Sequence, residues 1–595
     1  MKKIKMFKNL IVLTVLCISL VFASMVCAAT KITILQSSDL HGRIYPHDYA
    51  LDEEDQDAGF AKIQTLVEKE RAENPNVILM DCGDTVQDNS AMLFNDLPVH
   101  PMVGVMNMMK YDVWTLGNHE FNFNMPFLEK NIKAFEGSVL SANIYREGTS
   151  KRWVKPYVIF EKEGVRIAVV GMLPPAIPTW ESATPQHFEG LEFTDPMIET
   201  KKVIAELEGK YDVLVGAYHI GPQGEHGYEG LEEIAKNFPQ FHVLFGGHAH
   251  AKYNKEINGV KIIEPGAYGW SLAKADIEVV KKGSGYSVVS VNTENIETKT
   301  VQANQAVLDK FRFVHDQSVT DANLVVGKIA KNFVERVDYI TGQEQVTTMP
   351  TSQLEDTAII DFINDVQMHY TDAEVSSAAL FNFGSNLKAG DFKKKDVAYI
   401  YKYPNTLVGV NITGENLLKY MEWSASYYNT FTPGDLTISF NKDIRGYNYD
   451  MFSGVSYEID LSKEAGSRIK NAKIGGRDLD PKATYKLTIN NYRFGTIMKL
   501  GLVTNDDKYY DSVAQYADIP DGRIRDLIIK YTKEIKKGTI VPSVDYNWKL
   551  VGFSIDEALQ EKAFKMIQNG SLSIPTSEDG RTLNIKAIRV NDISN

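Results

Sequence analysis

The sequence predicts an α/β protein with at least two domains. Its 595 residues are too many for a single hydrophobic core. Its composition, 44% hydrophobic and 24% charged, is that of an ordinary globular protein. Between residue 31 and about residue 277, short apolar runs alternate with helical or loop segments, which is the pattern of a layered α/β domain.

The first 29 residues have the order of a secretory signal peptide. Four lysines precede an apolar stretch from Leu10 to Phe22, and small residues follow around Ala28 and Ala29. We therefore expect export to the periplasm, the cell surface or the medium, with no stable membrane insertion after cleavage. The alternative is an N-terminal membrane anchor, for which this apolar stretch is short.

The charge balance argues against a nucleic-acid polymer as a partner. Cleavage would remove the four lysines and change the formal net charge from −13 to −17. An acidic protein attracts polyanions poorly, although a small nucleotide held by metal ions is still compatible with this charge. Cleavage would also leave Cys82 as the only cysteine, so no internal disulfide is expected. The sequence leaves the oligomeric state open.

Seven short runs are expected to form the buried strands of the first domain. They cover residues 31–36, 77–80, 113–116, 166–170, 212–216, 242–245 and 261–263. These runs are mostly apolar, as strands covered on both faces are. Most are followed closely by Gly, Asp, Asn or His, so we expect the functional loops to lie beyond the strand ends.

The rest of the chain is expected to contain a helix and a second domain. Residues 352–370 have apolar side chains at helical spacing, and Thr351 or Ser352 could cap this helix. From about residue 372 the pattern changes to mixed strands and helices. We therefore predict a signal peptide over residues 1–29, a catalytic domain over 30–350, an interdomain helix over 351–371 and a substrate-binding domain over 372–595.

Side chains that can bind metal ions follow five of the predicted strands. The motifs are Asp39-Leu40-His41, Gly83-Asp84, Gly117-Asn118-His119-Glu120, His219 and Gly247-His248-Ala249-His250. Each motif alone is more often a turn, but their repeated placement at strand ends favours one shared site. Two divalent cations about 3.5–4 Å apart could neutralise a phosphoryl group and activate water. Mixed imidazole and carboxylate ligands suit Mn, Zn, Co or Fe better than Mg.

This set of motifs resembles the metallophosphoesterase signature of the 5′-nucleotidase superfamily. The resemblance implies a four-layer α/β/β/α catalytic domain and a second, α+β domain that binds the nucleotide. It implies one metal ion held by Asp39, His41, Asp84 and His250, and a second held by Asp84, Asn118, His219 and His248, with Asp84 bridging. It also implies that His119 lies beside the metals, where it would stabilise developing charge or protonate the leaving oxygen.

Asn122 indicates one branch of this superfamily. In the 5′-nucleotidase branch an Asp at this position orients the histidine, whereas Asn122 looks like the 2′,3′-cyclic-nucleotide 2′-phosphodiesterase/3′-nucleotidase branch. An amide can still orient the ring of His119 by hydrogen bonding, but it cannot stabilise an imidazolium as a carboxylate does. We therefore expect His119 and Asn122 to form the catalytic pair. A second departure from relatives is Asp88, where they usually have Gly after Gln87.

The C-terminal half contains segments similar to the same branch. Residues 401–408, 447–451 and 490–493 resemble its YPNTLV, YNFD and NNYR segments. By position, Tyr403 and Tyr492 correspond to the two rings that stack on the base in relatives. The alternative is that both tyrosines are core residues. Relatives carry a Gly-rich loop after Arg493, whereas this chain has few glycines there. The base preference therefore stays open.

The combined interpretation is an exported dinuclear-metal hydrolase of small nucleotides. We expect it to open 2′,3′-cyclic nucleotides to 3′-nucleotides and to hydrolyse 3′-nucleotides to nucleoside and phosphate. One alternative is a 5′-nucleotidase or UDP-sugar hydrolase, which Asn122 disfavours. The other is a non-catalytic nucleotide-binding surface protein, which the complete ligand set and His119 disfavour.

Overall fold

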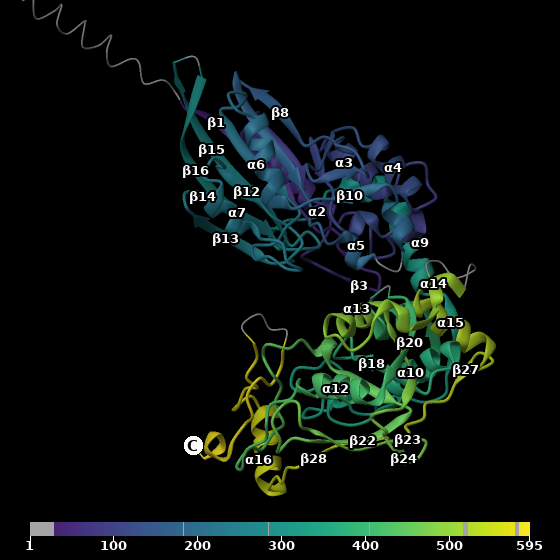
Figure 1. The fold of residues 1–595 in the computed structure, drawn as a ribbon. Helices are drawn as coiled ribbons and strands as arrows, with labels where there is room; N and C mark the ends of the chain where they lie inside the picture. Colours follow the sequence, from purple (N-terminus) through teal and green to yellow (C-terminus); the bar gives the residue numbers. More distant parts are fainter. Residues whose placement is uncertain are drawn as a thin grey trace, which may run out of the picture. The chain divides into compact units, whose positions relative to one another are not determined.

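The computed structural model describes residues 29–50, 52–181, 184–283, 285–403, 405–515, 522–577 and 582–594. All but the last residue of the expected signal peptide lies outside these described residues. Within the described ranges, no helix has both the length and the apolar character needed to cross a membrane. The chain divides into two compact units (Figure 1), with residues 1–48, 53–181 and 185–316 in unit 1 and residues 49–52, 182–184 and 317–595 in unit 2.

The first sheet of unit 1 has six strands in the order β16-β15-β1-β4-β5-β6. Its strands are β1 (Thr30–Ser37), β4 (Val77–Asp81), β5 (Val113–Thr115), β6 (Ser138–Leu140), β15 (Ser271–Lys282) and β16 (Gly285–Glu297). β1, β4, β5 and β6 run parallel, and β15 and β16 add antiparallel strands at one edge. Ser37 pairs with Asp81, so the carboxyl ends of β1 and β4 lie level and their loops begin side by side.

The second sheet of unit 1 has six strands in the order β13-β14-β12-β11-β9-β8. Its strands are β8 (Tyr157–Lys162), β9 (Val165–Met172), β11 (Val213–Tyr218), β12 (Val243–Phe245), β13 (Lys252–Ile257) and β14 (Val260–Pro265). The four central strands are parallel, and β8 and β13 are antiparallel edge strands. A further small sheet pairs β7 (Ile144–Arg146) with β10 (Leu191–Phe193).

Three apolar clusters hold unit 1 together as four layers. One contains side chains from both sheets, such as Ile34 and Val215, and so fills the space between them. The other two cover the outer sheet faces with helices, which removes the remaining apolar faces from water. The helices are α2 (Phe60–Glu73), α3 (Pro101–Met109), α4 (Met125–Ala134), α8 (Gln305–Lys310) and α9 (Arg312–Ala322) on the first sheet, and α6 (Pro196–Glu206) and α7 (Leu231–Asn237) on the second. The expected α/β/β/α fold is confirmed (Figure 1).

Unit 2 is a mixed α+β domain with one large core. Its five-stranded sheet has the order β21-β18-β25-β20-β26, and its three- and four-stranded sheets have the orders β19-β17-β27 and β24-β23-β22-β28. The strands are β17 (Val325–Ile329), β18 (Val375–Ala379), β19 (Gly390–Lys393), β20 (Leu407–Thr413), β21 (Asp450–Ser453), β22 (Val455–Asp460), β23 (Ile469–Ile474), β24 (Arg477–Asp478), β25 (Thr484–Asn490), β26 (Lys508–Asp511), β27 (Thr539–Ile540) and β28 (Trp548–Val551). The helices are α10 (Ala358–Thr371), α11 (Lys394–Ile400), α12 (Gly414–Ala425), α13 (Asn491–Lys499), α14 (Ser512–Gln515), α15 (Ile524–Glu534) and α16 (Glu557–Gln568).

Helix α10 is a core helix of unit 2. The sequence predicts an interdomain helix over residues 351–371, but α10 begins at Ala358, after a 3₁₀ turn at Thr351–Gln353. Its apolar residues Ile359, Phe362 and Val366 are buried in the core of unit 2. The compact units divide at residues 316–317 instead of residue 350, because β17 already pairs with β19 and β27 of unit 2.

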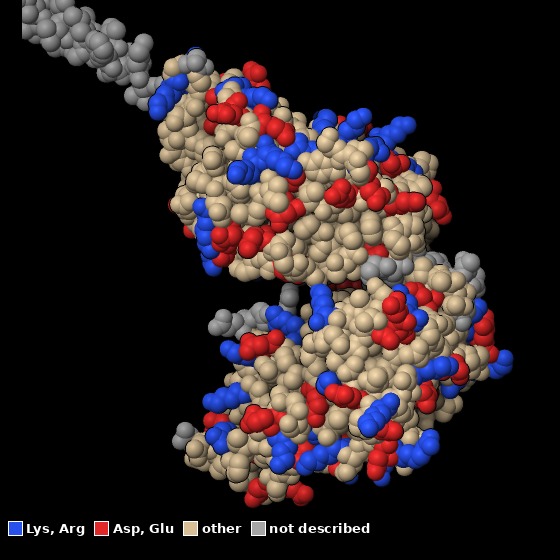
Figure 2. Space-filling model, in the orientation of Figure 1, with Lys and Arg blue, Asp and Glu red and all other residues tan. Residues whose placement is uncertain are grey.

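Charged side chains of both signs lie on one face of the molecule. On the face shown in Figure 2, Lys and Arg side chains are interspersed with Asp and Glu side chains. The whole chain has 64 basic and 77 acidic residues.

Candidate metal centre

The expected ligands follow the carboxyl ends of five strands of unit 1. Three strands of the first sheet and two of the second contribute. Asp39 and His41 follow β1, Asp84 follows β4, Asn118 follows β5, His219 follows β11, and His248 and His250 follow β12. The structure brings six of these side chains into two clusters, in each of which the potential ligand atoms lie within 4.8 Å of one another.

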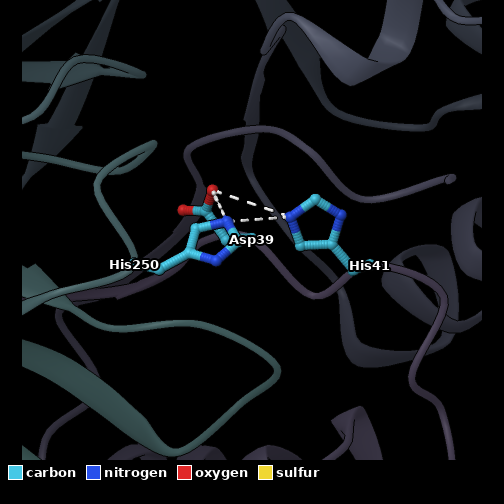
Figure 3. Close-up of side chains that lie close together, drawn as sticks. All are labelled: Asp39, His41 and His250. Atoms are coloured by element: carbon cyan, nitrogen blue, oxygen red, sulfur yellow. Dashed lines mark hydrogen bonds and ion pairs between the residues drawn. The ribbon is translucent and has the colours of Figure 1, made fainter. Parts of the chain in front are cut away.

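The first cluster consists of Asp39, His41 and His250 (Figure 3). The Nε2 atoms of the two histidines lie 3.0 Å apart. His250 Nε2 is 3.3 Å from Asp39 Oδ1, and His41 Nε2 is 4.0 Å from the same oxygen. Two imidazole nitrogens and one carboxylate oxygen therefore face a common point, which is the donor set that a transition metal ion prefers.

The second cluster consists of Asp84, His219 and His248. His219 Nε2 lies 3.0 Å from Asp84 Oδ2 and 3.2 Å from Asn118 Oδ1, so the expected amide ligand joins this cluster. The same nitrogen is 4.0 Å from Asp39 Oδ1. The two clusters are therefore adjacent, and the donors present fit a pair of divalent cations.

The electrostatics of the clusters also fit cations. Burial raises the pKa of Asp39, but His219 and His250 outweigh it and lower the pKa to about 2. Burial likewise opposes ionisation of Asp84, whose pKa the neighbouring His219 and His119 hold well below its usual range. Burial and the neighbouring His250 lower the pKa of His41 to about 3. The carboxylates are thus ionised and His41 is neutral, as metal binding requires. His219 differs, because burial lowers its pKa but Asp84 and Asp39 outweigh burial and raise the pKa to about 10. A cation bound there would therefore displace its proton.

Several ligands have a backbone conformation that is costly for residues other than glycine. Asp39, His41, Asp84, His248 and His250 all have positive φ, between 44° and 75°. Each such residue costs of the order of 1 kcal/mol or more and persists only where the surrounding fold imposes it. Strain of this kind is typical of functional sites. Here the positive φ angles direct ligands from three separate loops toward the same place.

A buried carboxylate that sequence reasoning did not single out supports the ligand loops. Glu120 is fully buried and accepts hydrogen bonds from the backbone N–H groups of Asp84 at 2.8 Å, Thr85 at 2.7 Å and Gly117 at 2.6 Å. Burial and the neighbouring Asp84 raise the pKa of Glu120. The only sequence signal was its position directly after His119. Cys82, next to this loop, is buried in the layer between the sheets.

His119 lies beside the second cluster and is only partly covered. Its side chain is 35% exposed, and its Nε2 is 4.0 Å from Asp84 Oδ2. Its Nδ1 is 2.5 Å from Asn122 Oδ1, so the expected pair is in hydrogen-bond contact. Burial lowers the pKa of His119, but Asp84 and the Asn122 hydrogen bond outweigh it and raise the pKa.

Two further carboxylates contact the site from loops without a recognisable motif. Glu225 Oε1 lies 2.5 Å from His248 Nε2. Glu181 Oε1 accepts a hydrogen bond from Asn122 Nδ2 at 2.8 Å. Sequence reasoning missed both because no spacing relates them to the residues that they contact.

The two tyrosines expected to hold the base both belong to unit 2, and both are exposed. Tyr403 is 37% exposed, and its ring lies perpendicular to that of Phe381 with the ring centres 5.4 Å apart. Tyr492 is 55% exposed and lies in the first turn of α13. The helix continues to Lys499, through the segment for which the resemblance implied a Gly-rich loop. Tyr447, which the sequence did not single out, is also exposed, with its ring centre 6.4 Å from that of Tyr403.

Comparisons with known proteins agree with this arrangement. Residues 32–252 match the calcineurin-like phosphoesterase family, and residues 325–498 match the 5′-nucleotidase C-terminal domain family. The trifunctional nucleotide phosphoesterase protein YfkN of Bacillus subtilis is 27% identical over 598 residues, which cover 88% of this chain but 39% of YfkN. This chain thus spans less than half the length of that relative.

Several other proteins match over most of their length, among them the following two. The 2′,3′-cyclic-nucleotide 2′-phosphodiesterase/3′-nucleotidase of Haemophilus influenzae is 28% identical over 609 residues, which cover 88% of each chain. A crystal structure of a Staphylococcus aureus protein in complex with α-ketoglutarate has the same fold, with a TM-score of 0.72 at 22% identity over 88% of this chain and 100% of that one. The chain therefore belongs to the 5′-nucleotidase superfamily of metallophosphoesterases, with a calcineurin-like phosphoesterase domain followed by a 5′-nucleotidase C-terminal domain.

Proposed function

We propose that this protein is an exported dinuclear-metal hydrolase of nucleotide phosphoesters. It opens 2′,3′-cyclic nucleotides to 3′-nucleotides and then hydrolyses 3′-nucleotides to nucleoside and phosphate. The observation that carries the proposal is the convergence of two His/Asp clusters beside His119. The names of the Haemophilus influenzae and Bacillus subtilis relatives support a nucleotide phosphoester as substrate.

Seven side chains would hold the two cations. Asp39, His41 and His250 would hold the first, and Asp84, Asn118, His219 and His248 would hold the second, with Asp84 also contributing to the first. When bound, Mn, Zn, Co or Fe ions would neutralise the phosphoryl charge and make water a better nucleophile near neutral pH. The carboxylate of Asp84 would contribute to both positions.

His119 has the position of the group that acts on the leaving oxygen. Its exposed ring edge can meet a substrate, while its backbone N–H donates to Asp84 Oδ1 at 2.7 Å and so ties it to the metal ligands. Its Nε2 would donate a proton to the ribose oxygen, or a hydrogen bond to a phosphoryl oxygen, as the ester bond breaks. Asn122 would hold the ring through Nδ1.

Tyr403 and Tyr492 would bind the base. Both rings are exposed, although large aromatic side chains are usually well covered. A nucleobase offers two apolar faces to such rings, and stacking accepts different bases with little discrimination. This supports a binding role over a core role and leaves the choice of base open.

A side-by-side assay of 2′,3′-cAMP, 3′-AMP and 5′-AMP with added Mn²⁺ or Co²⁺ tests the proposal. We expect turnover of the first two, release of 3′-AMP as an intermediate, and two metal ions per chain by elemental analysis. Faster turnover of 5′-AMP would favour the 5′-nucleotidase or UDP-sugar hydrolase alternative. Adenosine binding without hydrolysis of any ester would favour a non-catalytic surface protein.

Export is a separate part of the proposal. It rests on the order of charged, apolar and small residues in the first 29 positions. N-terminal sequencing of the protein recovered from the periplasm or medium should give a chain that begins at Ala29 or Thr30. A chain recovered from the cytoplasm with its first methionine intact would contradict this part alone.

A further inference from the structure

Three side chains form a hydrogen-bonded chain behind His119. Asn122 uses both ends of its amide, because Oδ1 lies 2.5 Å from His119 Nδ1 and Nδ2 donates to Glu181 Oε1 at 2.8 Å. The other oxygen of Glu181 lies 2.9 Å from His187 Nδ1. His187 is buried and anchors the far end of the chain. All four residues belong to unit 1.

The direction of these hydrogen bonds follows from the chemistry of the groups. An ionised carboxylate can only accept, so Glu181 requires the NH₂ group of Asn122 to face it. The amide oxygen of Asn122 must then face His119. That oxygen can also only accept, so His119 Nδ1 must carry a proton. A neutral His119 is thereby restricted to one tautomer, in which Nε2 carries the lone pair and lies on the side of Asp84. Nε2 is then the nitrogen that takes up a proton and, once protonated, donates it to the leaving oxygen.

Without Glu181 this restriction disappears. An amide can rotate by half a turn and present NH₂ in place of its oxygen, and the two orientations fit the same space. With NH₂ toward His119, Nδ1 would have to accept and the ring would adopt the opposite tautomer. An Asp at position 122 could accept the Nδ1 proton in either orientation and would need no such partner, whereas an amide does.

We infer that Glu181 is a positioning residue that fixes the orientation of Asn122 and, through it, the tautomer of His119. In this arrangement the carboxylate of Glu181 acts on His119 through the amide of Asn122 instead of by direct contact. The inference rests on the proposed function in one respect, namely that His119 acts on the leaving oxygen. It adds a requirement that neither the motifs nor the family matches contain.

Three variants test the chain of hydrogen bonds through kcat. Glu181→Gln offers both a donor and an acceptor, so it releases the constraint on Asn122. Asn122→Asp puts two carboxylates where the 2.8 Å hydrogen bond now lies. The double variant Asn122→Asp/Glu181→Gln restores a donor opposite the new carboxylate. We expect each single variant to lose about 10- to 100-fold in kcat on 3′-AMP, and the double variant to exceed Asn122→Asp by at least about tenfold.

The leaving group separates a role in catalysis from a role in stability. p-Nitrophenyl phosphate has a leaving group that departs without protonation, whereas the ribose oxygen of 3′-AMP needs a proton. We expect Glu181→Gln to lose at least about ten times more activity on 3′-AMP than on p-nitrophenyl phosphate. Glu189→Gln, an exposed change in the same segment, is the matched control and should leave both rates unchanged. Equal losses on both substrates, or no gain in the double variant, would overturn the inference.

The tautomer itself can be observed without turnover. Nitrogen-15 NMR of zinc-loaded, histidine-labelled protein, with His119 assigned from a His119→Gln variant, reports which ring nitrogen carries the proton. We expect Nδ1–H in the wild type and a mixture in Glu181→Gln. The same Nδ1–H tautomer in both proteins would refute the positioning role. Should the wild type hydrolyse no nucleotide, the proposed function fails, whereas this comparison still decides the role of Glu181.

Discussion

The buried carboxylate of Glu120 accepts a hydrogen bond from the backbone N–H of Asp84 at 2.8 Å. Two more backbone N–H groups, those of Thr85 and Gly117, point at the same carboxylate. These loops follow the neighbouring parallel strands β4 and β5. One side chain therefore clamps the loop of the shared ligand Asp84 to the loop that carries Asn118 and His119.

Replacing Glu120 with Gln should weaken this clamp. The new NH₂ group would face a backbone N–H, and a buried donor left unsatisfied costs about 1–3 kcal/mol. We expect the free energy of unfolding of the metal-free protein to fall by about that amount, measured by denaturant titration. Glu129→Gln, an exposed change in α4, is the control and should have no effect. A wild-type unfolding curve for Glu120→Gln would contradict the clamp.

The stability of unit 2 should fall as the pH rises from about 4 to about 8. One carboxylate oxygen from each of Asp356, Asp361 and Asp545 lies within 4.8 Å of those of the other two. Burial, followed by the neighbouring carboxylates, raises the pKa of Asp361 to about 8 and that of Asp356 to about 7. The folded state therefore binds more protons than the unfolded state in this range, and stability is lost as pH increases through the folded-state pKa values.

Asp361→Asn tests this pH dependence directly. The variant should release one proton fewer than the wild type when it unfolds. The slope of unfolding free energy against pH should therefore become shallower by up to about 1.4 kcal/mol per pH unit. Denaturant titrations between pH 5 and pH 8 measure the slope for wild type and variant. Asp478→Asn, at an exposed position of β24, serves as the control. Parallel slopes for wild type and Asp361→Asn would show that the cluster does not titrate in this way.

The central strands and the metal ligands could be predicted from sequence because both have local signals. β1, β4, β5, β9, β11, β12 and β14 each overlap one of the seven apolar runs. A strand that is buried on both faces must be apolar throughout, and this pattern is visible without knowledge of its neighbours. The ligands closely follow these strands, so their positions in the sequence were enough to predict that they share one site.

The features that could not be predicted depend on contacts between distant segments. The edge strand β13 is mostly exposed and has no apolar run. The unit boundary depends on the pairing of β17 with strands far along the chain. Glu181 and Glu225 contact the site from loops whose sequences carry no motif. Each of these features depends on a contact between segments far apart in the chain. A short stretch of sequence does not show which distant segment it will contact.

Removal of either exposed base-binding ring should raise KM for nucleotides and leave small phosphoesters unaffected. Tyr403→Ala and Tyr492→Ala each remove a stacking surface worth about 1–3 kcal/mol. We expect KM for 3′-AMP to rise about 5- to 150-fold, with little change in kcat or in the hydrolysis of p-nitrophenyl phosphate. Tyr546→Ala, at a ring that is 81% exposed, is the control. A loss of the same size on both substrates would point to a structural role for the tyrosine.

Glu225 should control the affinity of the second metal position. Its Oε1 lies 2.5 Å from His248 Nε2 and also accepts a hydrogen bond from the hydroxyl of Tyr228 at 3.1 Å. When His248 donates Nε2–H to this carboxylate, Nδ1 is the nitrogen left for a cation, and the carboxylate makes it a stronger ligand. We expect Glu225→Ala to weaken one of two zinc ions by about 10- to 100-fold and to leave the other unchanged.

Competition with a chromophoric chelator measures the two zinc affinities separately. Glu225→Gln, whose side-chain oxygen still accepts from His248, should lose less affinity than Glu225→Ala because part of the contact survives. Glu229→Gln changes an exposed residue of the same loop and should bind zinc as the wild type does. Within the described part of the chain, Glu225 has hydrogen bonds to His248 and Tyr228 and none to Asp39, His41 or His250. A loss at both positions would therefore mean that the loop has moved as a whole. Two ions bound with wild-type affinity in Glu225→Ala would show that the carboxylate does not support His248.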